Sequence, residues 1–238
     1  MNSEATYFFG RNILKEALAA KTKVDEIFFE TPSARKFAEG IYAVRSLKIP
    51  MSEGMPHEFK HQSHQGIAFR TSHSFYQNLS IPQLKEFPFI IFCNHVEDVH
   101  NFGSIARCAA AFGARAIVHE EKNSAELTPA AMKSSAGLAF RIKFSKVSNI
   151  IHPLKELISE GYHIVGLDAA PKATALFDWR PSFPLALVLG SEGCGIEPSV
   201  KSICSEIVQI PMEKFAESLN VSHAAGIAMN WAYRSIKL

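Results

Sequence analysis

Cysteine is scarce in this chain, and its four cysteines are far apart. No C-x-x-C pair occurs among Cys93, Cys108, Cys194 and Cys204. We therefore expect neither a disulfide-stabilised fold nor a zinc site with cysteine ligands. No apolar run approaches about 18 residues, so no transmembrane helix is expected. The first residues lack the basic start and apolar stretch of a secretory signal. We therefore expect a cytoplasmic protein with reduced thiols and no membrane partner.

A strong excess of charge of one sign is also missing. The formal net charge is +2, and residues 1–72 hold 10 of the 25 basic and 8 of the 23 acidic residues, so the remainder is balanced. The small basic excess at the front suits contact with phosphates, or it is simply a solvated surface. With 47% hydrophobic and 20% charged residues, the chain can bury a substantial core.

Several common catalytic and binding motifs are absent. The glycines from Gly190 to Gly195 do not have the G-x-G-x-x-G spacing of a dinucleotide site, which excludes a nicotinamide-dependent enzyme of that type. No G-K-[ST] follows them, and the chain contains no G-x-S-x-G elbow of a serine hydrolase. His57, His61 and His64 lie in a polar stretch without cysteine, and we expect no metal site there.

The periodicity of the chain predicts two units of α/β structure. Apolar runs predict strands at 89–93, 116–118, 163–167, 185–189 and 207–210, and helices are predicted between and after them, including 104–112 and 221–236. This alternation is typical of a mainly parallel sheet covered on both faces. We therefore predict a small α/β unit at 1–72, a linker at 73–88 and a larger α/β unit at 89–238.

Three unlike patches each follow a predicted strand of the larger unit. They are Asn101-Phe102-Gly103 with Arg107, then Gly190 to Gly195 with Glu192, and finally Ile210-Pro211-Met212 with Ser218-Leu219-Asn220. In open α/β sheets, ligands bind in the loops beyond the carboxyl ends of strands. The patches therefore predict one composite site.

Each patch also has a plainer interpretation when taken alone. Arg107 either reaches back over the predicted loop before it to hold a phosphate or a reacting oxygen, or is a surface arginine paired with Asp98 or Glu97. The glycines allow close approach to a ligand, or they form an ordinary turn. Asn220 or Ser222 belongs to the site or caps the last helix. The small residues of that helix indicate either a subunit interface or a central core helix.

Taken together, the patches resemble the SpoU (TrmH) family of RNA 2′-O-ribose methyltransferases in the SPOUT superfamily. The resemblance covers about 89–235 and rests on residues 98–103 with Arg107, on 187–196, and on 210–212 with 218–222. Residues 1–72 are similar to the L30e-like substrate-binding unit often fused in front, through Gly10, Asn12 and residues 64–66. The chain departs from the family pattern at Val99, Lys214 and about Trp231, where proline, glycine and glutamate are usual.

The resemblance implies a fold, a cofactor and a dimer. The fold is a SPOUT-type α/β domain with a deep trefoil knot behind a small L30e-like α/β domain, acting as a homodimer through its first and last helices. The cofactor is S-adenosyl-L-methionine, and the substrate is structured RNA, with 23S rRNA favoured over tRNA. The implied cofactor contacts are Leu167, Gly190, Gly195, Ile210, Met212 and Leu219.

The implied catalytic residues are Asn101, Arg107, Glu192, Ser218 and Asn220, and the implied RNA contacts are Arg11, Asn12 and Arg107. Because a guanidinium is effectively never deprotonated, we expect Arg107 to stabilise the forming alkoxide and a neighbouring phosphate. The proton then leaves through Ser218, Asn220 or water. The alternative is a non-catalytic RNA-binding protein that keeps the fold.

Overall fold

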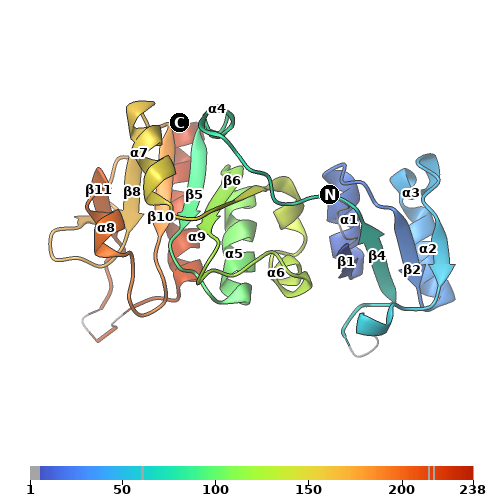
Figure 1. Ribbon diagram of the computed structural model, residues 1–238. Helices are drawn as coiled ribbons and strands as arrows, with labels where there is room; N and C mark the ends of the chain where they lie inside the picture. Colours follow the sequence, from blue (N-terminus) through green and yellow to red (C-terminus); the bar gives the residue numbers. More distant parts are fainter. Residues whose placement is uncertain (1–5, 60–61, 214, 217, 238) are drawn as a thin grey trace.

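The chain forms two sheets that lie side by side (Figure 1), in a computed structural model that describes residues 6–59, 62–213, 215–216 and 218–237. His61 and Lys214 lie outside these residues. The front sheet has the order β1-β4-β2-β3, in which β4 is antiparallel to β1 and β2. Its elements are β1 (Thr6–Phe9), α1 (Arg11–Ala19), β2 (Glu26–Phe29), α2 (Pro32–Gly40), α3 (Tyr42–Ser46), β3 (Met51–Glu53), the 3₁₀ turn His57–Phe59 and β4 (Ile67–Thr71).

The larger sheet has seven parallel strands in the order β7-β6-β5-β10-β8-β11-β9. This arrangement confirms the predicted parallel α/β architecture. The elements are α4 (Ile81–Leu84), β5 (Phe89–Cys93), α5 (Val99–Ala111), β6 (Ala116–Glu120), α6 (Pro129–Ser134), the 3₁₀ turn Leu138–Arg141, β7 (Lys143–Val147), α7 (Ile151–Ser159), β8 (His163–Leu167), β9 (Thr174–Ala175), β10 (Leu185–Leu189), α8 (Pro198–Lys201), β11 (Glu206–Gln209) and α9 (Val221–Lys237).

Helices cover both faces of this sheet. Side chains of α5, α6 and α9 share one hydrophobic cluster with one face, while side chains of α4, α7 and α8 share another cluster with the opposite face. Every residue of the central strands β5 and β10 is buried as a result, which is why both strands are uninterrupted apolar runs. No described helix has the length and apolar character needed to cross a membrane. The trefoil knot stays a prediction.

Helix α5 begins earlier than the sequence predicted. The expected helix started at about residue 104, with Asn101–Gly103 in a loop, but α5 already begins at Val99. Asp98 is the cause, because its side chain accepts a hydrogen bond from the Asn101 backbone N–H at 2.7 Å and caps the helix. Gly103 therefore lies inside the helix, where an added Cβ would come within 2.3 Å of the Ala131 carbonyl oxygen of α6.

The small residues of α9 serve the interior of one chain. Ala225, Ala228 and Ala232 are buried, and an added Cβ on Gly226 would lie 3.2 Å from the Cys108 sulfur of α5. Close packing of α9 on α5 accounts for these residues without a second subunit. The apolar side chain of Ile227, by contrast, is 42% exposed.

The two units share a packed junction. The Phe140 ring of the larger unit makes an edge contact with the Phe8 ring of β1 at 5.7 Å. The Phe75 ring lies 5.4 Å from Phe8 and 5.5 Å from Phe140. Beside them, the Arg141 guanidinium forms an ion pair with Glu16 of α1 at 3.0 Å. Part of the predicted linker, at Phe75, is thus built into the aromatic core between the units.

Candidate active site

A cavity of about 680 Å³ lies at the carboxyl ends of β8, β10 and β11. The three strands end here because parallel strands present their carboxyl ends at one edge of the sheet. All six residues predicted to bind the cofactor line this cavity: Leu167, Gly190, Gly195, Ile210, Met212 and Leu219. Glu192, Ser218 and Asn220 line it as well. The positions match the prediction, and the functional roles stay predictions.

The glycine-rich loop after β10 turns back tightly on itself. Ser191 and Gly195 exchange two backbone hydrogen bonds of 3.0 and 3.1 Å. An added Cβ on Gly190 would lie 2.2 Å from the Gly195 carbonyl carbon and 2.3 Å from the Ile196 nitrogen. Any side chain at position 190 would push the two arms of the loop apart, so this glycine is required for the wall of the cavity to form.

Hydrogen bonds connect the three predicted patches directly. The Asn101 side-chain amide donates to the Glu192 carboxylate. The Asn220 amide donates to the Asn101 side-chain oxygen at 2.9 Å and to the Glu192 Oε1 at 3.0 Å. Asn101 is buried, whereas Glu192 and Asn220 are exposed at the mouth. Residues from α5, from the glycine-rich loop and from the segment before α9 therefore form one polar network beside the cavity.

Asn220 also caps the last helix, so the capping interpretation is confirmed, while its role at the site stays a prediction. Its side-chain oxygen accepts hydrogen bonds from the Ser222 backbone N–H at 2.9 Å and the Ser222 hydroxyl at 2.6 Å. These bonds satisfy donors at the start of α9. The Asn220 side chain thus caps the start of α9 through its oxygen and bonds to the other two patches through its amide nitrogen.

Asp168 is a site residue that the sequence analysis missed. Its carboxylate lines the cavity, accepts a hydrogen bond from the Ile196 backbone N–H at 2.7 Å and forms an ion pair with Lys201 at 2.9 Å. The Asp168 side chain is only 7% exposed. It therefore anchors the end of the glycine-rich loop to the end of β8. Burial, with a smaller contribution from Asp168, raises the pKa of the Cys204 thiol to about 11, which keeps this thiol neutral.

Arg107 lies apart from the cavity of the single chain. Its side chain is exposed on α5 and is not among the residues lining the cavity. It forms no ion pair with Asp98 or Glu97 within the part of the chain that the structure describes, so the plainer interpretation of a paired surface arginine is wrong. Its role stays a prediction.

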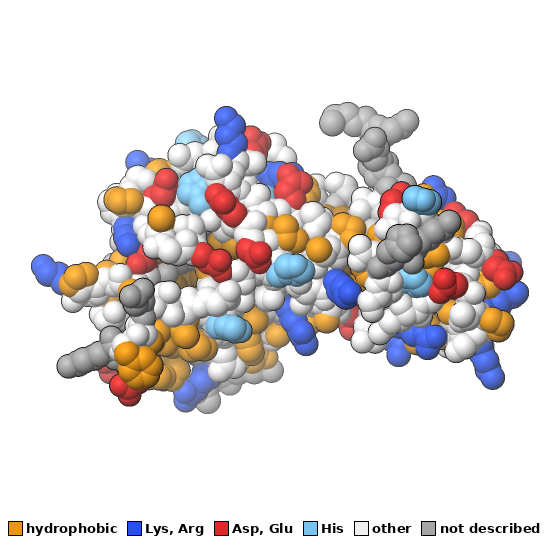
Figure 2. All heavy atoms as spheres, turned by 90° about the horizontal axis from the view of Figure 1, so that it is seen from below, with side chains coloured by type: hydrophobic (Ala, Val, Ile, Leu, Met, Phe, Trp, Pro, Cys, Tyr) orange, Lys and Arg blue, Asp and Glu red, His pale blue; other side chains and the backbone are white. Residues whose placement is uncertain are grey.

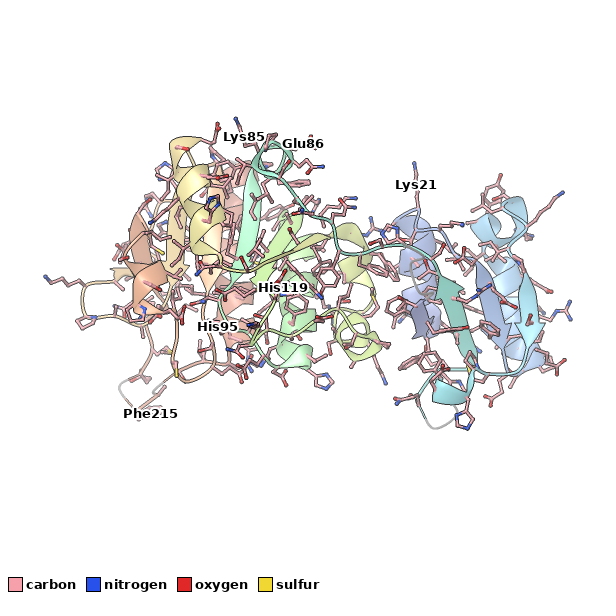
Figure 3. The ribbon with its side chains drawn as sticks, viewed as in Figure 1. Lys21, Lys85, Glu86, His95, His119 and Phe215 are labelled. Atoms are coloured by element: carbon pink, nitrogen blue, oxygen red, sulfur yellow. The ribbon has the colours of Figure 1, made fainter. Side chains whose placement is uncertain are left out.

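The predicted RNA contacts of the front unit lie at the start of α1. The Arg11 side chain donates to the Gln65 carbonyl at 3.2 Å and stacks over the Phe37 ring at 5.0 Å, while Asn12 is exposed. Lys21, just beyond the end of α1, lies on the same side of the molecule as Lys85, which precedes β5 and so marks the amino ends of the parallel strands (Figure 3). The start of α1 therefore faces the same side of the molecule as the carboxyl ends of the large sheet.

Two of the three departures from the family pattern can be placed. Val99 is the first residue of α5 and packs against the core. The Trp231 indole N–H of α9 donates to the Trp179 carbonyl at 3.1 Å, and its ring makes an edge contact with Phe177 at 5.6 Å. Both residues have a packing role that needs neither proline nor glutamate. Lys214 is outside the described residues.

Comparisons with known proteins agree with this architecture. The SpoU rRNA Methylase family matches residues 88–230, and the family described as RNA 2′-O ribose methyltransferase substrate binding matches residues 7–77. YacO of Bacillus subtilis, assigned to the TrmH family of tRNA/rRNA methyltransferases, is 30% identical over 246 residues, covering 98% of this chain and 97% of the relative. A tRNA/rRNA methyltransferase of Mycobacterium bovis is 33% identical over 241 residues, covering 95% and 73%.

Solved structures share the fold across both units. The SpoU methyltransferase AviRb from Streptomyces viridochromogenes, in complex with the cofactor AdoMet, superposes with a TM-score of 0.78 at 20% identity, covering 98% of this chain and 91% of that one. An rRNA methyltransferase from Sinorhizobium meliloti gives a TM-score of 0.77 at 18% identity, covering 98% and 88%. The predicted family and fold class are confirmed: this chain belongs to the SpoU family of tRNA/rRNA methyltransferases, with the substrate-binding unit in front.

Proposed function

We propose that this enzyme transfers a methyl group from S-adenosyl-L-methionine to a ribose 2′-hydroxyl of 23S rRNA. The observation that carries the proposal is the network of Asn101, Glu192 and Asn220 beside the glycine-walled cavity. It joins the three family motifs at one point. The match of the front unit to a 2′-O ribose substrate-binding family supports the ribose as the acceptor.

The cavity has suitable properties for the methyl donor. Its volume of about 680 Å³ is within the range of about 300–1,000 Å³ usual for small-molecule sites. Gly190, Ile210 and Leu219 line it. When bound, S-adenosylmethionine supplies a methyl carbon that is already electrophilic because it is attached to a positively charged sulfur. No metal is needed for that chemistry.

The residues of the network would position the reacting groups. Holding two reactants in line can contribute about 7–11 kcal/mol to lowering a barrier. Oε1 of Glu192 is occupied by the two amide donors, while no hydrogen bond to Oε2 is formed within the described residues. We assign Oε2 to accept the hydrogen bond, and then the proton, of the ribose hydroxyl. Ser218 lines the same cavity and offers a second path through its hydroxyl.

Arg107 and a second copy of the chain would complete the site. Exposed apolar side chains gather near the cavity and α9: Phe177, Met212, Phe215, Leu219 and Ile227. This patch is suited to a homodimer interface. Arg107, exposed and without an ion-pair partner in the described part of the chain, would stabilise the developing alkoxide and an adjacent phosphate. Arg11 and Asn12, on the same side of the molecule, would bind a part of the RNA further from the methylated nucleotide. The enzyme would act in the cytoplasm, where ribosomal RNA is found.

The acceptor atom can be tested by methylating transcripts of 16S rRNA, 23S rRNA and tRNA with tritiated S-adenosylmethionine. We expect label in 23S rRNA and one missing band in an alkaline hydrolysis ladder, because cleavage needs a free 2′-hydroxyl. Label that leaves the ladder complete would mean base methylation and would refute the ribose assignment. Binding of RNA without calorimetric binding of S-adenosylmethionine would favour the non-catalytic alternative.

Variants separate the proposed roles. Asn101→Ala should lower the single-turnover rate by at least about 10²-fold, while Asn230→Ala, an exposed asparagine of α9, should leave it unchanged. Arg107→Ala should keep the affinity for S-adenosylmethionine and lower turnover. If Arg107→Lys retained near-full activity, the bidentate role of the guanidinium would be wrong.

A further inference from the structure

His95, Glu120 and Glu197 form a second cluster of ionisable side chains, apart from the network above. His95 follows β5, Glu120 ends β6 and Glu197 immediately precedes α8. His95 Nδ1 lies 3.5 Å from Glu120 Oε2, and His95 Nε2 lies 3.5 Å from Glu197 Oε1. Figure 3 shows His95 at the carboxyl edge of the sheet, and Figure 2 shows acidic and histidine side chains grouped on this face.

The Glu120 carboxylate lacks an ordinary cationic partner. Its side chain is only 7% exposed, and the Asn94 amide donates to its Oε2 at 3.2 Å. No lysine or arginine forms an ion pair with Glu120 or Glu197 in the described parts of the chain. A buried carboxylate is unfavourable unless a positive charge compensates it. A bound cation would supply that charge.

Unsatisfied polar atoms at the cluster point to a ligand. His95 Nδ1 is fully buried without a hydrogen-bond partner, and so is the Ser124 hydroxyl. The Ala125 N–H bonds to the Val96 carbonyl at 2.8 Å, which holds the loop carrying Ser124 against the loop carrying His95. Buried polar atoms without partners are rare in native proteins and call for a ligand or another explanation.

We propose that His95, Glu120 and Glu197 bind a divalent transition-metal ion, with zinc as the best fit. One imidazole nitrogen and two carboxylate oxygens are ligands that zinc accepts at about 2.0–2.2 Å. Tetrahedral angles then place neighbouring ligand atoms about 3.4 Å apart, close to the 3.5 Å between His95 Nδ1 and Glu120 Oε2, so Nδ1 would be the ligating nitrogen and Glu197 would have to turn from Nε2 towards it. One donor atom from each residue lies within 4.8 Å of the others. The half-exposed Glu197 can move to close the site.

The ion would stabilise the neighbourhood of the methyl-donor cavity. Glu197 follows the glycine-rich loop directly, and its backbone N–H already donates to the Asn94 side chain at 2.9 Å. A metal bridge would tie this point to the ends of β5 and β6. Its role is structural, and the chemistry proposed for the methyl transfer does not depend on it.

The test is calorimetric titration of the full chain with zinc after treatment with a chelator. We expect one ion per chain, a higher melting temperature with zinc, and visible absorption on replacement by cobalt. Glu197→Gln and His95→Asn should each weaken zinc binding at least tenfold. Asparagine is the conservative choice at position 95 because the backbone there has φ of 56°, which asparagine tolerates. Glu120→Gln should act likewise if circular dichroism shows it folded.

The matched control is His152→Gln. His152 and Glu156 form an exposed histidine–glutamate pair at 3.3 Å without a third ligand, so this variant should bind zinc as the unaltered chain does. The proposal is overturned if the chain binds no zinc. Zinc binding that survives both Glu197→Gln and His95→Asn also overturns it. Neither result bears on methyl transfer, which is measured separately.

Discussion

Replacing Asp168 by alanine should loosen the glycine-rich loop from β8. The change removes a charge-assisted hydrogen bond to the Ile196 N–H, a contact worth about 1.5–3 kcal/mol. It also removes the ion pair with Lys201, worth about 0–1 kcal/mol because the Lys201 side chain is partly solvated. We therefore expect Asp168→Ala to lower the free energy of unfolding by about 1.5–4 kcal/mol.

Urea denaturation followed by circular dichroism measures this loss, and Lys201→Ala is the control. Lys201→Ala should cost less than Asp168→Ala, because it leaves the bond between Asp168 and Ile196 in place and lets water reach the carboxylate where the partly exposed lysine lay. Calorimetry should show that Asp168→Ala weakens S-adenosylmethionine binding at least tenfold. Equal losses of stability in the two variants would refute the reasoning, since the ion pair rather than the anchored backbone would then carry the energy.

Three further predictions address the cavity and the junction. Gly190→Ala should abolish S-adenosylmethionine binding in calorimetry, because its Cβ would lie 2.2 Å from backbone, while Gly40→Ala, with nothing within 4 Å, should bind normally. S-adenosylmethionine should slow alkylation of the exposed Cys194, as measured by mass spectrometry. Cys93 should not react, because burial raises the pKa of its thiol to about 12. If S-adenosylmethionine did not slow the alkylation of Cys194, the assignment of the cavity would be contradicted. Burial and nearby Lys143 lower the pKa of His73 below 6.5, so the unfolded chain binds this proton more tightly than the folded chain does. The stability of the fold should therefore fall as the pH drops from about 6.5. His73→Gln should make the melting temperature less dependent on pH in this range.

The central strands were predictable because burial on both faces leaves no polar positions. β5 and β10 are continuous apolar runs in sequence and fully buried in the structure. β7 was missed because it is an edge strand with exposed and partly exposed lysines, so its sequence, KFSKV, lacks a long apolar run. β1 and β3 are only 4 and 3 residues long, too short for a periodicity to register.

The site was predictable in its location but not in its internal contacts. Strand order places the carboxyl ends together, so the three patches had to converge. The bond from Ile196 to Asp168 spans 28 residues, and a single aspartate after a strand has no distinguishing pattern. Gly103 misled the prediction, because a glycine near a strand end suggests a loop. Its actual purpose is the close crossing of α5 and α6, which only the folded structure reveals.

The aromatic junction has a consequence for how an RNA position is chosen. Separating the two units would expose the rings of Phe8, Phe75 and Phe140 to water, which is costly. We therefore expect the distance between the start of α1 and the cavity to stay fixed. Under the proposed RNA contacts, the nucleotide that receives the methyl group would be selected by its distance from the RNA feature bound at the start of α1, and lengthening or shortening the intervening RNA would shift the mark to a different nucleotide or prevent it.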